Sequence, residues 1–393
     1  MPRNAFFLFY FTAIFLQSGT YGLTFLLPPL FAGFGADEKA VGTVLAVTMV
    51  TTLIAVLYLG HITARFGRMM TVAASGILIA LSLFLFGTGS ETGLQLYAAG
   101  ALLGVGWGLF YVLTPVVITQ IIEKSERVRY FTLLSVFIMA GFGLAPVLGA
   151  YFVKTGYGIE TTFLVTSALC VLSSAIFFLL ANTVARLSTS EDAGDQNALT
   201  LQSLGALLKT RALRPIIMVW LGASVFASIT NFQTVYAALN NFDYADYFLA
   251  YTITVIVCRV LLAEFMGGRA PYAVIAALLA VMVASVGLFL VLDDSRILYI
   301  IGAILFGIGY GVSYPIVKAM AANDAELALM SQTLQVFGFA YFIGVFGFPF
   351  VAGWILTETS IAVLLCIALV MAALECILAA LRHFGDRKHE DRR

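Results

Sequence analysis

Arg259 is the residue of this sequence whose type and position most strongly suggest chemistry, because it stands near the middle of the apolar stretch 247–266. A charged side chain inside such a stretch is costly to bury and usually functional. A guanidinium can bind a carboxylate or phosphate, or couple to a proton carrier. Glu264 follows five residues later, which on a helix turns it about 140° away from Arg259. Two interpretations stay open: an anion site facing a cavity, or a structural arginine neutralised by Glu264, by Asp324 or by helix carbonyls.

Enzyme chemistry and metal binding find no support in the sequence. It contains no H-E-x-x-H, no G-x-S-x-G and no Walker loop. The three histidines, His61, His383 and His389, stand near the ends of apolar runs, and the four cysteines show no C-x-x-C spacing. Basic residues near the end of the chain alternate with acidic ones, unlike a nucleic-acid-binding arm. We therefore expect no catalytic residue, no metal, no cofactor and no nucleic-acid partner.

The elements that position Arg259 are predicted to be apolar helices. The chain is 61% hydrophobic and 11% charged, whereas soluble domains carry about 25% charged residues. Twelve apolar runs are each long enough, at roughly 20 residues, to cross a hydrocarbon core about 30 Å thick. The predicted spans are roughly 5–32, 40–61, 67–88, 94–122, 130–153, 161–184, 213–239, 247–266, 271–292, 297–320, 330–357 and 360–382. The sequence thus predicts an all-α integral membrane protein with twelve transmembrane helices.

A single long polar stretch, from about Asn182 to Pro215, separates six spans from the other six. The predicted units are a six-helix bundle over 1–184, a cytoplasmic linker over 185–212 and a six-helix bundle with a short tail over 213–393. Residues 199–209 have an amphipathic pattern and are expected to lie on the membrane surface. Of the 21 Lys and Arg residues, 17 lie on the side that holds both termini and 3 on the other. This bias predicts cytoplasmic termini, and the short loops favour a prokaryotic inner membrane.

The two halves of the sequence resemble each other. Three glycines and a tyrosine of the fourth span recur 203 residues later in the tenth span: Gly104, Gly106, Gly108 and Tyr111, then Gly307, Gly309, Gly311 and Tyr314. Because both sets stand at the same ordinal place of their halves, they indicate a duplicated six-helix unit. Internal repeats of this kind are typical of secondary transporters, whose substrate sites lie between the repeats.

The connection between the second and third spans reads Gly60-His61-Ile62-Thr63-Ala64-Arg65-Phe66-Gly67-Arg68-Met69-Met70. It resembles the G-x-x-x-D-R-x-G-R-[RK] loop of the major facilitator superfamily, and with twelve spans and a central linker the resemblance covers nearly the whole chain. The resemblance implies a gating role for Gly60, Arg65, Gly67 and Arg68. Glycines permit close helix approach, and arginines hold the helix ends in water. Ala64 replaces the family's acidic residue, so the acidic half of its conformational latch is missing.

A second resemblance surrounds Pro146 in the fifth span. Residues 141–150 are similar to the family's G-x-x-x-G-P-x-x-G-G signature, associated with exporters that exchange substrate for protons, although Ala145 and Ala150 replace two glycines. Proline removes one helical hydrogen bond and bends the helix, so Pro146 is a candidate gating residue or a structural kink. The fourth span lacks the basic residue that the family uses in proton coupling, since Gly100 stands at that position.

The resemblance further implies a central cavity lined by spans 1, 4, 7, 8, 10 and 11. Polar groups that line a wet cavity avoid the cost of burial in lipid. The candidate substrate-binding residues on these spans are Arg259, Gln17, Tyr21, Tyr111, Asn231, Gln233, Tyr236, Tyr314, Gln332 and Gln335. Glu264 is a candidate coupling residue. Glu375 lies in the twelfth span, which is peripheral in the family, and is expected to serve packing.

These features predict a secondary active transporter that works by alternating access in two pseudo-symmetric six-helix bundles. The sequence leans towards proton-coupled export of an amphipathic or anionic metabolite or drug. An uptake carrier or facilitator for an organic anion is the alternative, and a polytopic sensor or intramembrane enzyme is a remote one. The expected partners are a small-molecule substrate, a coupling proton and the lipid bilayer, and the expected oligomeric state is a monomer.

Overall fold

The structure, a computed structural model, describes residues 3–187, 201–262, 271–326 and 329–390. Within these residues, twelve helices are long and apolar enough to cross a membrane. The first six spans are α1 (Arg3–Leu23) continued by η1 (Thr24–Leu26) and α2 (Leu27–Ala32), then α3 (Glu38–Leu57), α5 (Arg68–Gly87), α6 (Leu94–Thr119), α7 (Arg127–Lys154) and α8 (Glu160–Leu187). A short helix, α4 (Leu59–Phe66), follows α3, and η2 (Lys124–Glu126) precedes α7.

The last six spans follow the short helix α9 (Leu201–Leu207). They are α10 (Leu213–Asn231) with α11 (Gln233–Leu239), α12 (Tyr244–Leu262), α13 (Pro271–Val291), α14 (Arg296–Asn323), α15 (Met330–Phe342) with the π-helical η5 (Ile343–Gly347) and α16 (Phe348–Glu358), and α17 (Ile361–Glu390). The described residues contain no strand. The predicted all-α fold with twelve membrane-spanning helices is confirmed.

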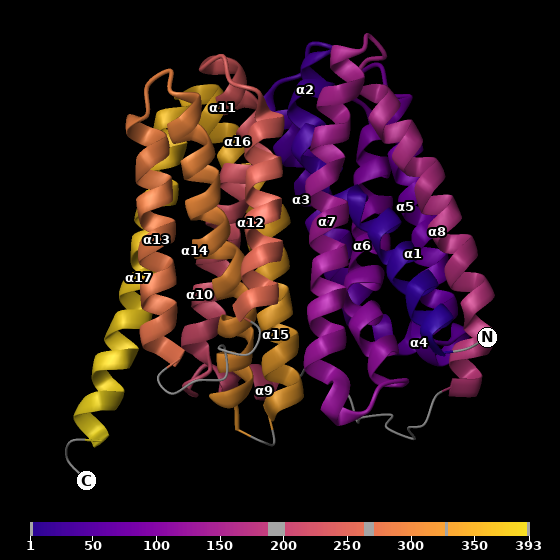
Figure 1. Ribbon diagram of the computed structural model, residues 1–393, viewed down its shortest axis with the longest axis vertical. Coiled ribbons are helices and arrows are strands. Elements are labelled where there is room, and N and C mark those ends of the chain that lie inside the picture. The colour runs from indigo at the N-terminus through magenta and orange to yellow at the C-terminus, as the bar shows by residue number, and fades with distance from the viewer. Residues whose placement is uncertain (1–2, 188–200, 263–270, 327–328, 391–393) are drawn as a thin grey trace.

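The helices form two bundles that stand side by side (Figure 1). In the first, α1 packs on α7 and α8, α3 on α6, and α5 on α6 and α8. In the second, α12 packs on α14, α13 on α14 and α17, and α10 on α14 and α17. The two bundles meet mainly where α7 contacts α12 and where α3 contacts α16. Two six-helix bundles are therefore confirmed, while the exact boundaries at residues 184 and 212 stay a prediction.

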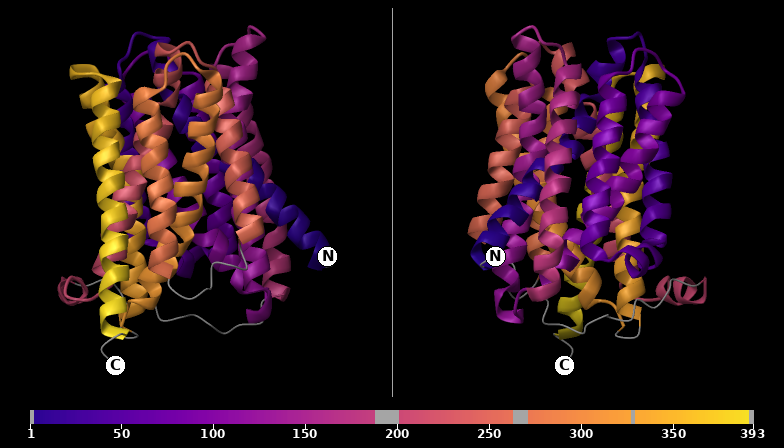
Figure 2. Two further views of the ribbon diagram at one scale, coloured as in Figure 1. Left: turned by 60° about the vertical axis from the view of Figure 1, so that its left-hand side comes forward. Right: turned by 90° about the vertical axis from the view of Figure 1, so that its right-hand side faces the viewer.

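Both ends of the described chain lie at one end of the molecule. The start of α1, the end of α17, α4 and α9 all gather there, and we call this the linker end and its opposite the far end (Figure 1). The predicted amphipathic segment 199–209 forms a helix over Leu201–Leu207, which runs across the direction of the spans (Figure 2). Leu207 is fully buried, and α9 contacts α15. Its position on a membrane surface stays a prediction.

The repeat seen in the sequence is also present in the packing. Gly104 and Gly108 of α6 face threonines of α3, and Gly307 and Gly311 of α14 face residues of α12. The glycine between each pair faces the next helix: Gly106 faces α5, and Gly309 faces α13. Hydrogen bonds repeat as well, since Ser82 Oγ donates to the Ala99 carbonyl at 2.7 Å and Ser285 Oγ donates to the Gly302 carbonyl at 2.8 Å. Both residues of the second bond lie 203 positions after those of the first. The bundles are therefore pseudo-symmetric.

Several spans are interrupted where a bend is needed. The helix of the first span breaks over Thr24–Leu26, just before Pro28 and Pro29, and the eleventh span passes through a π-helical segment just before Pro349. The seventh span breaks at Phe232, between α10 and α11. Local breaks of this kind interrupt regular hydrogen bonding and often mark functional sites. Pro146, in contrast, lies inside the continuous helix α7.

Candidate functional site

A cavity of about 280 Å³ lies between the two bundles. Its wall takes residues from α1, α6 and α7 of the first bundle and from α10, α12, α14 and α15 of the second. Most of the wall is aromatic: Tyr21, Trp107, Tyr111, Phe131, Phe142, Phe226, Tyr251, Tyr310, Tyr314 and Tyr341. Arg259 and Lys318 are the cations among the described lining residues, and none of those residues is acidic. The cavity thus combines aromatic faces with positive charge.

The cavity reaches from the middle of the spans towards the linker end. Helix α7 starts at the linker end and contributes residues 131–142, from its first half. Helix α14 runs the opposite way and contributes residues 310–318, from its last half. Both segments therefore lie on the same side of the middle of the molecule. The cavity is displaced from the centre towards the linker end.

Arg259 reaches across the boundary between the bundles. Its Nε donates to the Gly311 carbonyl of α14 at 3.0 Å, and its Nη1 donates to Ser135 Oγ of α7. Its Nη2 has no partner among the described residues, so this part of the guanidinium remains available to a ligand. The alternative in which Asp324 neutralises Arg259 is wrong, because Asp324 pairs with Arg382 at 3.6 Å and accepts a hydrogen bond from Tyr272 at 2.5 Å. Glu264 lies outside the described residues.

Lys318 is a residue of the cavity that the sequence analysis did not identify. Its side chain is exposed and lines the cavity, and it has no hydrogen bond or ion pair to any described residue. Its position near the predicted end of the tenth span made it look like one of the basic residues that mark the cytoplasmic side. The internal repeat could have pointed to Lys318. The residue 203 positions before it is Pro115, and Pro115 also lines the cavity.

Two tyrosines at equivalent positions of the repeat meet in the cavity wall. Tyr111 Oη and Tyr314 Oη lie 3.3 Å apart, and the ring of Tyr341 lies 4.9 Å from that of Tyr314 and 5.8 Å from that of Tyr111. Deeper in the cavity, Tyr21 stacks on Trp107 at 5.1 Å. The Tyr21 hydroxyl is buried without a partner in the described structure. Such rings can stack on an aromatic ligand, and the Tyr21 hydroxyl can bond to it.

Of the ten expected substrate-binding residues, the structure brings Arg259, Tyr21, Tyr111 and Tyr314 to this cavity. It places Gln17 elsewhere: the side chain is fully buried in the first bundle, where its Nε2 donates to Ser75 Oγ at 3.2 Å and its Oε1 accepts from Ser173 Oγ at 3.1 Å. These bonds connect α1 with α5 and α8. Gln17 thus stabilises packing within the bundle.

The polar residues of the seventh span also lie away from the cavity. Gln233 Nε2 donates to Tyr299 Oη at 2.8 Å, and Tyr236 Oη donates to the Phe289 carbonyl at 2.8 Å. Asn231 Nδ2 donates to the carbonyl four residues earlier in its own helix. Each side chain satisfies buried polar groups of the second bundle. The expectation that these residues line the cavity is not met in this structure, where all three are bonded within the second bundle instead.

The two glutamines of the eleventh span do not line the cavity either. Gln332 is buried and its Oε1 has no partner among the described residues, and Gln335 is half-buried. Tyr341, nine residues after Gln332 in the same span, lines the cavity in their place. The choice between these positions depends on how α15 is rotated against its neighbours.

The candidate gating residues of the loop after α3 form a turn at the linker end. Gly67 separates α4 from α5 with φ of 80°, a conformation that favours glycine. Gly60 and Arg65 are exposed, Arg68 is half-buried, and neither arginine has an ion pair with a carboxylate of the described chain. This arrangement agrees with the absence of an acidic residue at Ala64. Pro146 lies in α7 beside glycines that face α1, namely Gly141 and Gly149.

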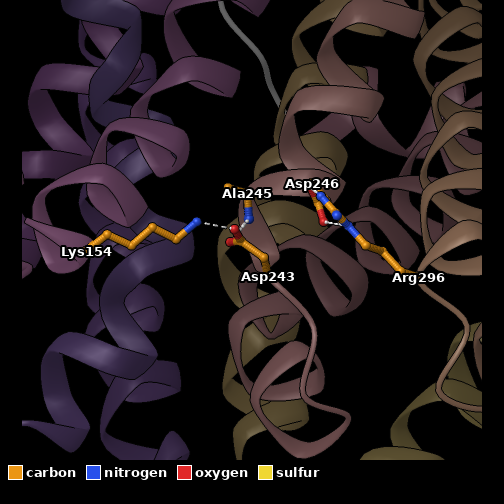
Figure 3. Close-up of polar contacts among 5 residues, drawn as sticks. All are labelled: Lys154, Asp243, Ala245, Asp246 and Arg296. Atoms are coloured by element: carbon orange, nitrogen blue, oxygen red, sulfur yellow. Dashed lines mark hydrogen bonds and ion pairs between the residues drawn. The ribbon is translucent and has the colours of Figure 1, made fainter.

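Ion pairs join the bundles at the far end. Lys154, the last residue of α7, lies 2.5 Å from the carboxylate of Asp243, just before α12 (Figure 3). Burial alone would raise the pKa of Asp243, but the Lys154 ammonium and the Ala245 N–H hold that pKa below its ordinary value. Lys39 of α3 pairs with Glu358 at the end of α16 and lies 4.4 Å from the centre of the Trp354 ring. The far end is therefore held by two ion pairs between bundles.

Close backbone contact also shuts the far end. A Cβ at Gly353 of α16 would lie 2.3 Å from the Glu38 carbonyl oxygen of α3, and one at Gly42 of α3 would lie 2.6 Å from the Pro349 carbonyl oxygen. These distances leave no room for a side chain. The bundles thus touch at the far end, while the cavity lies towards the linker end.

Comparisons with known proteins agree with this architecture. The sequence profile of the Major Facilitator Superfamily matches residues 9–349. The MFS-type transporter clz4 of Cochliobolus lunatus is 28% identical over 193 residues, which are 49% of this chain and 33% of that protein. The match thus spans about a third of that relative's length.

Solved structures of transporters share the fold. The crystal structure of a mutant of the nucleoside transporter NupG aligns with a TM-score of 0.76 and 14% identity, over 97% of this chain and 99% of that one. The crystal structure of the nucleoside transporter NupG aligns with a TM-score of 0.74 and 15% identity, over 96% and 99%.

Proposed function

The chain belongs to the major facilitator superfamily and is a membrane transporter of that family; we propose that it carries a small aromatic organic anion through the central cavity by alternating access, as a secondary active transporter. The observation that carries the proposal is the composition of the cavity wall. Two cations and ten aromatic residues line it, and the described wall has no acidic residue. An anion in the cavity can form charge-assisted hydrogen bonds with both cations, so the site favours an anion.

The same observation speaks against other substrate classes. A cationic drug would meet Arg259 and Lys318 with no carboxylate in the described wall to balance it. A neutral solute, such as a nucleoside, would leave both cations unpaired. The volume of about 280 Å³ is near the lower limit of small-molecule sites and suits a ligand with one or two rings. Among the substrates predicted from the sequence, the cavity therefore favours amphipathic anions.

We place proton-coupled export first among the directions of transport. The residues around Pro146 resemble the signature that the family associates with proton-exchanging exporters, and the cavity lies towards the linker end, which the Lys and Arg bias assigns to the cytoplasm. Uptake or facilitated diffusion of the same anion is the alternative. Proteoliposomes loaded with terephthalate separate the two, because this dianion does not cross lipid as a neutral acid. An imposed pH gradient therefore drives it against its own gradient only if transport is coupled to protons.

Arg259 is the residue whose replacement tests the proposal. We expect Arg259→Ala and Arg259→Lys to abolish transport of aromatic carboxylates while expression stays intact. Alanine removes the positive charge that pairs with the anion. Lysine keeps the charge but lacks the planar guanidinium, which can donate hydrogen bonds to Gly311, Ser135 and a ligand at once. Uptake of radiolabelled terephthalate, a dianion that does not cross lipid as a neutral acid, into proteoliposomes measures the effect.

Arg211→Ala is the matched control, because it removes the same charge from an exposed position at the linker end. It should transport at the parent rate. Parent-level transport by Arg259→Ala would sink the anion-site proposal. A parent protein that moves no aromatic anion would sink the proposed substrate class.

A further inference from the structure

We propose that Lys318 is a second anion-binding residue of the cavity and that the preferred substrate is therefore an aromatic dianion. This inference rests on the proposed function and goes beyond it in naming the charge of the substrate. The Lys318 ammonium lines the cavity and has no hydrogen bond or ion pair within the described chain. An ammonium ion carries three donors, and each of them can form a charge-assisted hydrogen bond with an anion in the cavity.

The two cations lie along one wall of the cavity. Arg259 is bonded to the carbonyl of Gly311, and Lys318 follows seven residues later on the same helix, α14. Seven residues are about two turns, or about 10 Å, and return to nearly the same face of the helix. Side chains of a helix tilt towards its N-terminus, so the Lys318 side chain leans back towards the level of Gly311. The two charges are thus within reach of one small molecule.

Comparison of the repeats shows that the charge was added to one half only. The residues equivalent to Lys318 and Arg259 in the first half, 203 positions earlier, are Pro115 and Val56. The aromatic positions, in contrast, are kept in both halves, with Trp107 and Tyr111 of α6 matching Tyr310 and Tyr314 of α14. The symmetric part of the wall can hold a ring, while the second bundle alone holds two anionic groups.

Two ligands of equal shape and different charge test this inference. Terephthalate carries two carboxylates on one ring, and 4-carbamoylbenzoate replaces one of them by a neutral amide. Isothermal titration calorimetry of the purified full-length protein gives the dissociation constant of each ligand. We expect the parent to bind terephthalate about tenfold more tightly than 4-carbamoylbenzoate, as one additional charge contact provides.

Lys318→Met should reduce this ratio to about one, because the second carboxylate of terephthalate then has no cation to pair with. Lys318→Arg, which keeps the charge, should preserve most of the ratio. Lys209→Met removes a lysine from an exposed position outside the cavity and should behave as the parent.

Each outcome decides one of the two proposals. Equal affinity of the parent for both ligands, or an unchanged ratio in Lys318→Met, would overturn the role of Lys318 while leaving the anion carrier intact. Failure of the parent to bind either ligand would instead overturn the proposed function. Monodisperse elution of each variant on size exclusion establishes that a lost ratio does not come from unfolding, and retained binding of 4-carbamoylbenzoate establishes the same for the site.

Discussion

Glu375 is a charged residue type inside a span that packs against a neighbouring helix. Its side chain is 2% exposed in α17, and its carboxylate lies against Gly222 of α10, where the missing side chain leaves room for it. Its Oε2 has no hydrogen-bond partner among the described residues. The residue does not line the cavity. A polar oxygen buried without a partner costs about 1–3 kcal/mol, so this residue is a weak point of the second bundle.

We expect Glu375→Leu to keep transport and to leave the melting temperature unchanged or raised, by the equivalent of about 1 kcal/mol. Leucine fills a similar space without a polar group to desolvate. Thermal unfolding of the detergent-solubilised protein measures the stability, and proteoliposome uptake measures the transport. Glu375→Gln, which keeps both shape and polarity, should gain no stability. Loss of proton-driven transport in both variants, with the melting temperature preserved, would show instead that Glu375 takes part in coupling.

At the scale of elements, the contact of α3 with α16 keeps the far end shut. The helices approach so closely that the Glu38 carbonyl fills the space of a side chain at Gly353. Gly338 of α15, in the same span, has open space around it. A glycine-to-alanine substitution therefore creates a steric conflict at Gly353 and none at Gly338.

Gly353→Ala should push the far ends of the bundles apart and slow transport, because the new methyl group meets backbone rather than a movable side chain. Overpacking of this kind typically costs about 1–3 kcal/mol. A cysteine at Thr234, which is buried and contacts the Phe25 carbonyl across the bundle boundary, reports far-end opening by its reaction with a membrane-impermeant maleimide. The background has Cys170, Cys258, Cys366 and Cys376 replaced. In Gly338→Ala, the cysteine at position 234 should react at the parent rate. Equal reaction rates of this cysteine in Gly353→Ala and in the parent would refute the idea that close packing at Gly353 keeps the far end shut.

For the molecule as a whole, we expect the ion pairs at the far end to bias the balance between the two conformations of the proposed alternating access. Lys154–Asp243 and Lys39–Glu358 both connect one bundle with the other. Partly exposed pairs each contribute under about 1 kcal/mol, so they can shift the balance without locking it. A lock as strong as a packed core would stop the transport cycle.

Asp243→Asn should raise labelling of the Thr234→Cys reporter several-fold at pH 7, in line with the loss of about 1 kcal/mol. The pKa of Asp243 in the closed state lies below its ordinary value. The ion pair therefore contributes its full stabilisation of the closed state at any pH above the ordinary pKa, and this stabilisation is lost as the pH falls through the lowered pKa. Labelling of the parent should thus be insensitive to protonation of Asp243 between pH 6 and about 8. An unchanged labelling rate in Asp243→Asn would remove this pair from the gate. Asp293→Asn, a change at an exposed position of another far-end loop, is the control.

Family membership, the twelve spans, the two bundles and the repeat could be predicted from the sequence because each depends on a pattern that the bilayer or gene duplication imposes locally. Apolar runs must be helical to satisfy their backbone in lipid, and matched glycines at a constant spacing show duplication. The candidate site was predicted only partly. Tyr21, Tyr111, Tyr314 and Arg259 lie on its wall, whereas Gln17, Gln233 and Tyr236 bond within a bundle.

The sequence by itself determined which residues are polar inside a span, since residue type and hydropathy are local properties. The tertiary structure alone decided which of them meet a cavity and which meet a neighbouring helix. That choice depends on the rotation of each helix and on breaks such as the one at Phe232, both of which are set by packing against helices far away in the chain. The structure likewise brought Lys318 to the cavity wall with Arg259, because the packing of α12 on α14 places both cations at the same cavity.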